Sequence, residues 1–210
     1  ADIIPLTPNE QYTVEDQARI LFQQILEGLH YLHRVHRICH RDIKPANFLV
    51  SGSGRVLIAD LAMSFVMPPG GMVQDIGQFG TPPFMVPEIA MSRPFDGPKC
   101  DYWAAIVTLY SLITGIPYLY RFPRPDDVLF RYCIMARGLS RDRENELVQQ
   151  VCAEMTDAQE IIMLREVILQ IQKMPMDLLE LFENSLSLIP EQRWGSEEAA
   201  RCRWMQSGPT

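Results

Sequence analysis

The sequence predicts a mainly α fold, α+β overall, in which a helical body carries one or two small β-hairpins. Apolar residues recur with helical spacing between residues 14 and 33 and again in the second half of the chain. Two short apolar runs, 48–50 and 56–58, flank a glycine-bearing turn. With 210 residues the chain can bury one core and is short for two complete domains.

The first helix is predicted to begin after Thr13, whose hydroxyl can cap it, because acidic residues fill the turn that follows. Apolar side chains recur with helical spacing as far as Leu32, so the helix should end between His33 and His36. His30, His33 and His36 lie three residues apart and could form a metal-binding face, but no carboxylate or cysteine completes a set. Surface or capping histidines are the favoured interpretation.

The runs 48–50 and 56–58 are predicted to pair as a hairpin across a Gly-Ser-Gly turn. This turn links two strands and therefore lacks the strand-to-helix context of a nucleotide-binding loop. The hairpin places Asn47 before its first strand and Asp60 after its second, so the two residues should meet on one side of a cleft. Residues 61–84 are rich in proline and glycine without periodicity, which predicts a long functional loop.

The most apolar stretch, 102–120, is predicted to be a buried central helix. Polar and helix-breaking residues interrupt it, so its apolar runs are far shorter than a bilayer requires. Further helices are predicted at 126–137, 177–188 and 196–205, and apolar residues at helical spacing also occur within 140–173.

The bulk composition excludes several classes of protein. The chain is 47% hydrophobic and 21% charged, as in an ordinary globular domain, and its formal net charge of −7 argues against binding to nucleic acid or to an anionic membrane. Five cysteines at wide, irregular spacing suggest neither a disulfide framework nor a zinc site. A reducing interior fits best, and the expected location is intracellular and cytoplasmic.

One segment carries the strongest chemical signal. Residues 40–47 read HRDIKPAN, which places a carboxylate, an ammonium and a carboxamide within six residues. These groups suit phosphoryl transfer: the carboxylate can accept a hydroxyl proton, the ammonium can neutralise the migrating phosphoryl group, and the carboxamide can bind Mg²⁺. A solvent-exposed turn held by local hydrogen bonds is the alternative for this segment taken alone.

Further segments follow in a fixed order: residues 60–62 read DLA, 80–88 read GTPPFMVPE, 101–103 read DYW, and Arg193 comes late in the chain. Together with HRDIKPAN they resemble the motifs of eukaryotic protein kinases of the serine/threonine type. The resemblance runs from about residue 12 to residue 205, nearly the whole chain. It implies the fold of the large lobe of a protein kinase.

By this resemblance, Asp42 would orient and deprotonate the substrate hydroxyl, and Lys44 would contact the transferring phosphate. Asn47 and Asp60 would bind the Mg²⁺ ions that bridge the phosphates of ATP. The implied cofactors are ATP and Mg²⁺, and the implied partner is a protein substrate with a serine or threonine hydroxyl. Thr81 supports the serine/threonine type, because in that type this threonine hydrogen-bonds the catalytic Asp and Lys.

Other residues would support the site. The resemblance implies that Leu49 packs beneath the adenine and that His40 and Leu61 form part of a packed spine linking the two lobes. Asp101 would anchor the backbone of the catalytic loop from the N-terminus of the central helix.

Two arginines are also given partners by the resemblance. Arg193 would form a buried ion pair with Glu88 that holds the substrate loop to the helices. Arg41 usually pairs with a phosphate on the loop that follows the metal motif, yet the only hydroxyl in that loop is Ser64. A phosphorylation switch at the usual place is therefore absent, and Asp75 could mimic the phosphate.

The chain departs from the family in three ways. It has no Gly-rich loop, strand lysine or Glu-bearing helix, so residues 1–210 are interpreted as a kinase C-terminal lobe without its small lobe. That lobe is expected in cis in a longer parent protein, and the isolated chain is expected to be inactive without it. Ala62 replaces the usual glycine of the metal motif. Residues 140–173 are longer and more charged than in most kinases and are interpreted as a helical insertion.

Three functions compete. The leading hypothesis is a protein serine/threonine kinase, because the four polar catalytic positions are intact. The alternative from another class is a pseudokinase or docking module that lacks catalysis, which the missing small lobe and Ala62 favour. A small-molecule kinase of the same fold is the third, but such enzymes usually lack the segment found at residues 80–88.

Overall fold

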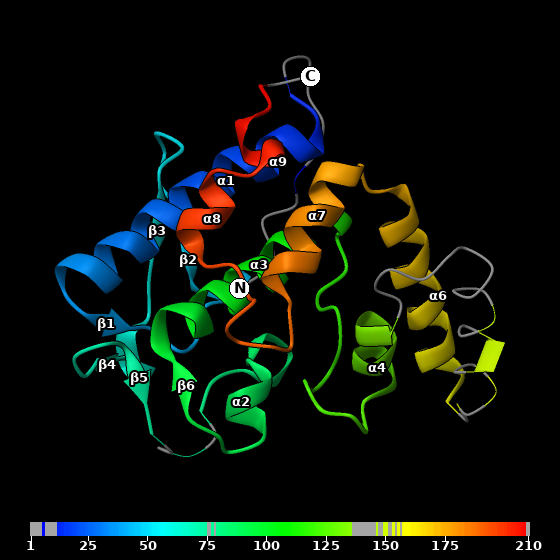
Figure 1. Ribbon diagram of the computed structural model, residues 1–210. Coiled ribbons are helices and arrows are strands. Elements are labelled where there is room, and N and C mark those ends of the chain that lie inside the picture. Colours follow the sequence, from blue (N-terminus) through cyan, green and yellow to red (C-terminus); the bar gives the residue numbers. More distant parts are fainter. Residues whose placement is uncertain are drawn as a thin grey trace.

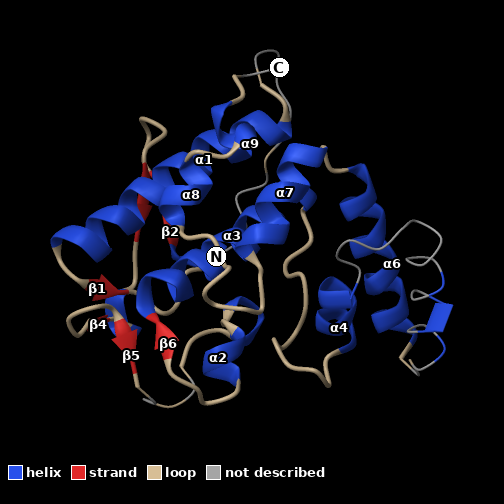
Figure 2. Ribbon diagram, in the orientation of Figure 1, coloured by secondary structure: helices blue, strands red, loops and turns tan. Residues whose placement is uncertain are grey.

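The computed structural model describes residues 6, 12–74, 77, 79–135, 146, 149, 150, 153, 155 and 157–208. The predicted mainly helical fold is confirmed (Figures 1 and 2). Among the described residues, the α-helices whose bounds are defined are α1 Val14–His30, α2 Pro87–Ala90, α3 Gly97–Thr114, α4 Val128–Met135, α6 Ala158–Lys173, α7 Met176–Ser185, α8 Ser196–Ala200 and α9 Arg203–Gln206.

The described strands form three separate antiparallel pairs. Their bounds are β1 Ile38–Cys39, β2 Phe48–Val50, β3 Val56–Ile58, β4 Phe65–Val66, β5 Met72–Val73 and β6 Phe95–Asp96. The predicted hairpin is β2–β3, with Leu49 opposite Leu57. The pairs β1–β4 and β5–β6 join segments distant in the chain through strands of two residues, which are too short to show periodicity in the sequence.

Helix α1 begins as the sequence predicts. The Thr13 hydroxyl accepts a hydrogen bond from the backbone N–H of Asp16 at 3.1 Å, and the Asp16 carboxylate accepts one from the backbone N–H of Thr13 at 3.1 Å. The helix ends at His30 and continues as one π-helical turn, Tyr31–Val35. His33 lies within this turn and is buried, so the expectation of surface or capping histidines is wrong for this residue.

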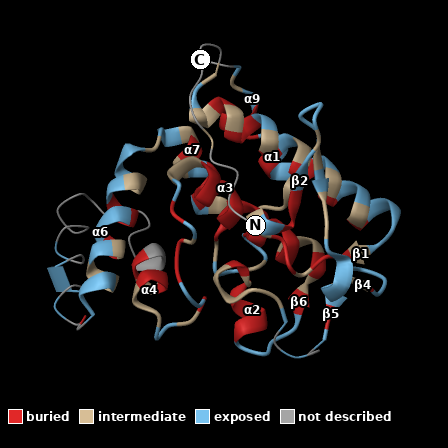
Figure 3. Ribbon diagram, turned by 180° about the vertical axis from the view of Figure 1, so that it is seen from behind, coloured by how far each residue is buried: buried red, intermediate tan, exposed pale blue. Residues whose placement is uncertain are grey.

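Helix α3 forms the centre of the molecule. Asp96 caps its N-terminus by accepting a hydrogen bond from the backbone N–H of Lys99 at 3.0 Å, and Gly115 ends it with a left-handed φ of 72°. Every residue from Cys100 to Leu112 is buried, and Figure 3 shows buried residues concentrated along this helix. No helix among the described residues is long and apolar enough to span a bilayer.

The C-terminal segment differs from its prediction. One helix was predicted at 196–205, but α8 and α9 are separated by Arg201 and Cys202, and the backbone of Cys202 is extended. The break brings Trp204 against α1, where its indole N–H donates to the Glu15 carboxylate at 2.6 Å and its ring lies 4.8 Å from the guanidinium carbon of Arg19. Burial of this ring ties the last helix to the first.

The predicted helices at 102–120, 126–137 and 177–188 correspond to α3, α4 and α7, with ends shifted by several residues. Within the interpreted insertion 140–173, helix α6 is present and buries Leu164, Val167 and Ile168. Most of residues 136–156 lie outside the described part of the chain. Whether this region is an insertion therefore stays a prediction.

Candidate active site

The backbone of residues 40–47, the catalytic loop by the resemblance, is anchored on one buried carboxylate. Asp101, in the first turns of α3, accepts hydrogen bonds from the backbone N–H of His40 at 2.7 Å and of Arg41 at 2.8 Å. Its Oδ2 also accepts one from Nε2 of the buried His33 at 2.8 Å. Three donors thus satisfy a carboxylate that has no exposed surface. His33 follows Leu29 on the buried face of α1 by four residues, a helical spacing that could have indicated its burial.

His40 is a further buried support of the loop. Its Nδ1 accepts a hydrogen bond from the backbone N–H of Asp42 at 3.3 Å, and its Nε2 lies 2.9 Å from the carbonyl oxygen of Ala59. An amide can only donate and a carbonyl can only accept, so these partners require a neutral ring with its proton on Nε2. The ring therefore connects the catalytic loop to the strand that precedes Asp60.

Asp42 lies at the centre of a polar cluster. Its Oδ1 accepts a hydrogen bond from the Thr81 hydroxyl at 2.6 Å. Its Oδ2 accepts from Lys44 Nζ at 2.7 Å and from Asn47 Nδ2 at 3.1 Å. Lys44 Nζ also donates to the Thr81 hydroxyl at 2.8 Å. Two segments separated by almost forty residues thus meet on one carboxylate.

These donors decide the ionisation of Asp42. Burial is the largest single influence and would raise the pKa of the carboxyl, but the hydrogen bonds from Lys44, Thr81 and Asn47, with the Lys44 charge, outweigh it. The net pKa is lowered, so the carboxylate is ionised at neutral pH. A carboxylate offers about four acceptor positions, and the cluster fills three of them, which leaves one on Oδ1.

Asn47 and Asp60 are connected by the ends of the β2–β3 hairpin. The backbone N–H of Ala59 donates to the carbonyl of Asn47 at 2.8 Å. Asn47 Nδ2 donates to Asp42, while Oδ1 of Asn47 accepts from no described donor. Asp60 accepts a hydrogen bond from the backbone N–H of Ala62 on its Oδ1 at 3.3 Å. One amide oxygen and one carboxylate oxygen are therefore left, and oxygen ligands are those that Mg²⁺ prefers.

Residues 60–62, the metal motif by the resemblance, have an unusual backbone. Asp60 adopts a left-handed conformation with φ of 63° and is exposed, whereas Ala62 is not among the residues with positive φ. The conformation therefore does not require glycine at position 62. In the described residues, no group of three or more His, Cys, Asp or Glu side chains is arranged to hold a metal ion.

Leu49, expected beneath the adenine, and Leu61, expected in the spine, are both on the surface. Leu49 is 56% exposed on the outer face of β2, and Leu61, after Asp60, is 48% exposed. The structure thus leaves an apolar surface beside Asn47 and Asp60 uncovered. His40, the other residue of the expected spine, is fully buried, unlike Leu61.

Glu88 and Arg193 form a buried bidentate pair. Arg193 Nη2 donates to Glu88 Oε1 at 2.7 Å and Nη1 to Oε2 at 3.3 Å. Arg193 Nε donates to the carbonyl of Ser187 at 2.8 Å, and the guanidinium carbon lies 4.7 Å from the centre of the Trp103 ring. This pair joins α2 to the segment that precedes α8 and to the central helix.

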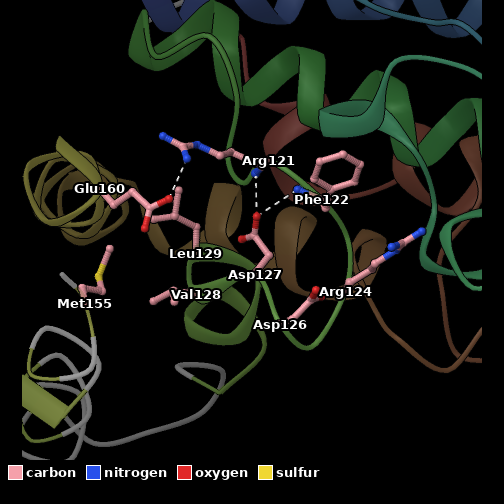
Figure 4. A pocket seen from close by; sticks show the side chains of 9 residues that line it. All are labelled: Arg121, Phe122, Arg124, Asp126, Asp127, Val128, Leu129, Met155 and Glu160. Atoms are coloured by element: carbon pink, nitrogen blue, oxygen red, sulfur yellow. Dashed lines mark hydrogen bonds and ion pairs between the residues drawn. The ribbon is translucent and has the colours of Figure 1, made fainter. Parts of the chain in front are cut away.

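A separate pocket lies between the loop after α3 and helices α4 and α6 (Figure 4). Its volume is about 390 Å³, and its walls include Phe122, Leu129 and Glu160. The Arg121 guanidinium contacts the Glu160 carboxylate at 2.6 Å, while Arg124 Nε donates to the carbonyl of Ala90 in α2 at 3.2 Å. None of the motif residues lines it.

The comparison with known proteins decides the family. The sequence pattern of the protein kinase domain matches residues 3–205. The chain belongs to the protein kinase family. Its likeness to protein kinases covers the polar cluster around Asp42 and the pair formed by Glu88 and Arg193.

Individual protein kinases match about half of the chain. Sperm motility kinase 2B of Mus musculus is 44% identical over 112 residues, which are 52% of this chain and 22% of that protein. The mitosis inducer protein kinase cdr2 of Schizosaccharomyces pombe is 37% identical over 116 residues, 55% of this chain and 14% of that kinase. Serine/threonine protein kinase OSK3 of Oryza sativa subsp. indica is 39% identical over 101 residues, which are 48% of this chain and 19% of that kinase.

The aligned stretch thus spans at most 22% of the length of these relatives. These kinases carry long segments that have no counterpart in the alignments. The substrates and partners of the whole protein therefore belong to the proposal below.

Proposed function

We propose that this chain is the large lobe of a protein serine/threonine kinase, which transfers the γ-phosphoryl group of ATP to a serine or threonine hydroxyl of a protein. The observation that carries the proposal is the arrangement of Lys44 and Thr81 on the Asp42 carboxylate. The serine/threonine kinases among the relatives favour the same acceptor. A small lobe in cis would complete the nucleotide site.

Asp42 would act as the catalytic base. The substrate hydroxyl would donate to the free acceptor position on Oδ1, which orients its oxygen for attack on phosphorus. As the new oxygen–phosphorus bond forms, the bond from the γ-phosphorus to the oxygen that bridges to ADP breaks, ADP leaves, and the hydroxyl proton passes to the carboxylate. Lys44, which lies 2.7 Å from the same carboxylate, would neutralise charge on the transferring group.

Asn47 and Asp60 would bind Mg²⁺ through their remaining oxygens. Mg²⁺ sites commonly combine one or two carboxylates with substrate phosphates and water, so two protein ligands are enough when the phosphates supply others. When bound, the ion neutralises the charge of the ATP phosphates. The exposed surface of Leu49 would contact the adenine ring from below.

Nucleotide binding by the full-length protein tests this assignment. Mg·ATP at about 100 times its Kd should stabilise the protein by about 2.7 kcal/mol, measured as a rise in the urea midpoint. Asp60→Ala should abolish the Mg²⁺-dependent part, while the matched surface change Asp126→Ala should leave it intact. Absence of any Mg²⁺-dependent stabilisation would favour the docking module over the enzyme.

A further inference from the structure

The side chain of Arg41 lies between two aromatic rings. Its guanidinium carbon is 4.9 Å from the centre of the Phe65 ring and 4.8 Å from that of Phe79. Its Nε donates to the carbonyl of Met63 at 2.5 Å. These four residues are called the Arg41 clamp below. Within the described part of the chain, the Arg41 guanidinium forms no ion pair with a carboxylate.

The clamp joins three segments that the reaction needs in one place. Arg41 directly precedes Asp42, and its backbone N–H is fixed on Asp101. Phe65 lies in β4 opposite Cys39 of β1, the strand that leads into the catalytic loop. Phe79 lies two residues before Thr81, whose hydroxyl donates to Asp42.

The backbone on the Phe79 side has little freedom of its own. Gly80 has φ of 105°, and a Cβ at this position would lie 2.6 Å from the carbonyl oxygen of Arg41. The chain therefore passes Arg41 in close backbone contact before it reaches Thr81. The turn that follows is held by the hydrogen bond from the Phe84 N–H to the Thr81 carbonyl at 2.9 Å.

A guanidinium stacked on an aromatic face gains about 0.5 to 1 kcal/mol at an exposed site, and more when water is excluded. Phe79 is 40% exposed, Phe65 is less exposed, and neither ring carries charge. Within the described residues, these contacts of the Arg41 guanidinium are thus made with uncharged groups. Ser64, the one hydroxyl in the loop from 61 to 79, donates to the carbonyl of Leu61 at 2.7 Å.

We propose that Phe65 and Phe79 are positioning residues: by enclosing the Arg41 guanidinium they hold Thr81 on Asp42 without an ion pair between Arg41 and a described residue of the loop. This inference rests on the proposed function for its link to catalysis, but the clamp itself can be measured without activity. It also differs from a phosphate mimic at Asp75, which lies outside the described residues.

The test is amide hydrogen exchange of the full-length protein, read at the Phe84 and Met85 amides, which bond to the Thr81 and Pro82 carbonyls. Phe79→Leu keeps an apolar side chain and removes the ring, so exchange there should accelerate about two- to fivefold. Phe79→Tyr retains the ring and should exchange as the wild type does. Arg41→Lys keeps the charge, loses the planar face and should behave like Phe79→Leu.

Phe122→Leu is the matched control. Phe122 is 45% exposed, and its ring lies 5.7 Å from the Arg124 guanidinium carbon (Figure 4). Phe122→Leu therefore removes a contact between an arginine and an aromatic ring outside the Arg41 clamp. It should leave the Phe84 and Met85 amides unchanged. Wild-type exchange in Phe79→Leu, failure of Phe79→Tyr to preserve protection, or equal acceleration of all amides would overturn the proposal.

Phosphoryl transfer gives the second readout. If the full-length protein is active, Phe79→Leu should lower kcat by about two- to fivefold with the KM for ATP unchanged, because the clamp acts on Thr81 and Asp42. A change in KM alone would contradict this assignment. If the protein shows the exchange pattern but no phosphoryl transfer, the clamp stands and the proposed function fails.

Discussion

The hydrogen bonds around Asp42 show how one carboxylate can be buried and still ionised. Desolvation favours the neutral acid, but three donors and the Lys44 ammonium favour the anion and dominate. In the proposed reaction, a base that is ionised before substrate arrives would accept the hydroxyl's hydrogen bond at once. The same donors fix the direction of its free acceptor position.

The lowered pKa of Asp42 predicts a pH dependence of stability. An unfolded aspartate has a pKa of about 3.9, so the ionised, hydrogen-bonded group stabilises the fold above about pH 4. This contribution is lost as the pH falls through the lower pKa of the folded state. The difference in free energy of unfolding between wild type and Asp42→Asn, measured in urea from pH 3 to 7, should shrink at the acid end. A pH-independent difference would contradict the lowered pKa.

The pair formed by Glu88 and Arg193 should be costly to break. The two side chains are 10% and 2% exposed, so Glu88→Gln leaves an arginine buried without its counter-charge. We expect a loss of about 3 to 5 kcal/mol in the free energy of unfolding. Glu197→Gln is the control, because the Glu197–Arg34 pair is exposed and should contribute about 1 kcal/mol or less. Equal losses in the two variants would show that burial does not set the cost.

At the scale of elements, the sequence predicted the helices and strands that are marked by residues close together in the chain. The capping residues of α1, the hairpin β2–β3 and the apolar length of α3 were each visible in short windows. The strands β1 and β4 were missed because two residues show no alternation, and their pairing depends on segments far apart. The break between α8 and α9 was missed because burial of Trp204 against α1 decides it.

The candidate site shows the same division. The spacing of Asp42, Lys44 and Asn47 within one loop was readable, since these residues are close in sequence. The contact of His33 with Asp101 spans 68 positions, so no short window of the sequence shows it. The rings around Arg41 come from two segments of a loop without periodicity, so the sequence offered no signal for them.

Substitution of Gly80 tests how closely the segment at residues 80–88 passes the loop at residues 40–47. Gly80→Ala would place a Cβ 2.6 Å from the Arg41 carbonyl oxygen, whereas Gly115 has φ of 72° with open space around it. Gly115→Ala should therefore lower the free energy of unfolding by about 1 to 2 kcal/mol, through left-handed backbone strain alone. Gly80→Ala should lower it clearly more, because the added Cβ also meets the Arg41 carbonyl oxygen. Denaturant unfolding of both variants measures the difference. Equal losses would mean that the close approach is relieved without cost.

At the scale of the whole molecule, the central helix connects the parts of the site. Asp101 of α3 holds the catalytic loop, and Trp103, two residues on, lies against the arginine that pairs with Glu88. The loop that carries Asp42 is thus hydrogen-bonded to α3, in which every residue from Cys100 to Leu112 is buried (Figure 3). The surface around Leu49 and Leu61 stays exposed beside it, where the proposed small lobe and nucleotide would bind.

Phosphoryl transfer by the full-length protein, measured with radiolabelled Mg·ATP and casein as the acceptor, tests the central claim most directly. The account predicts transfer to serine or threonine of casein and a fall of about a hundredfold or more in kcat for Asp42→Ala. Lys99→Ala, a change outside the cluster, should retain activity. No transfer by the wild type would contradict the proposed kinase activity, and undiminished transfer by Asp42→Ala would contradict the assignment of Asp42 as the catalytic base.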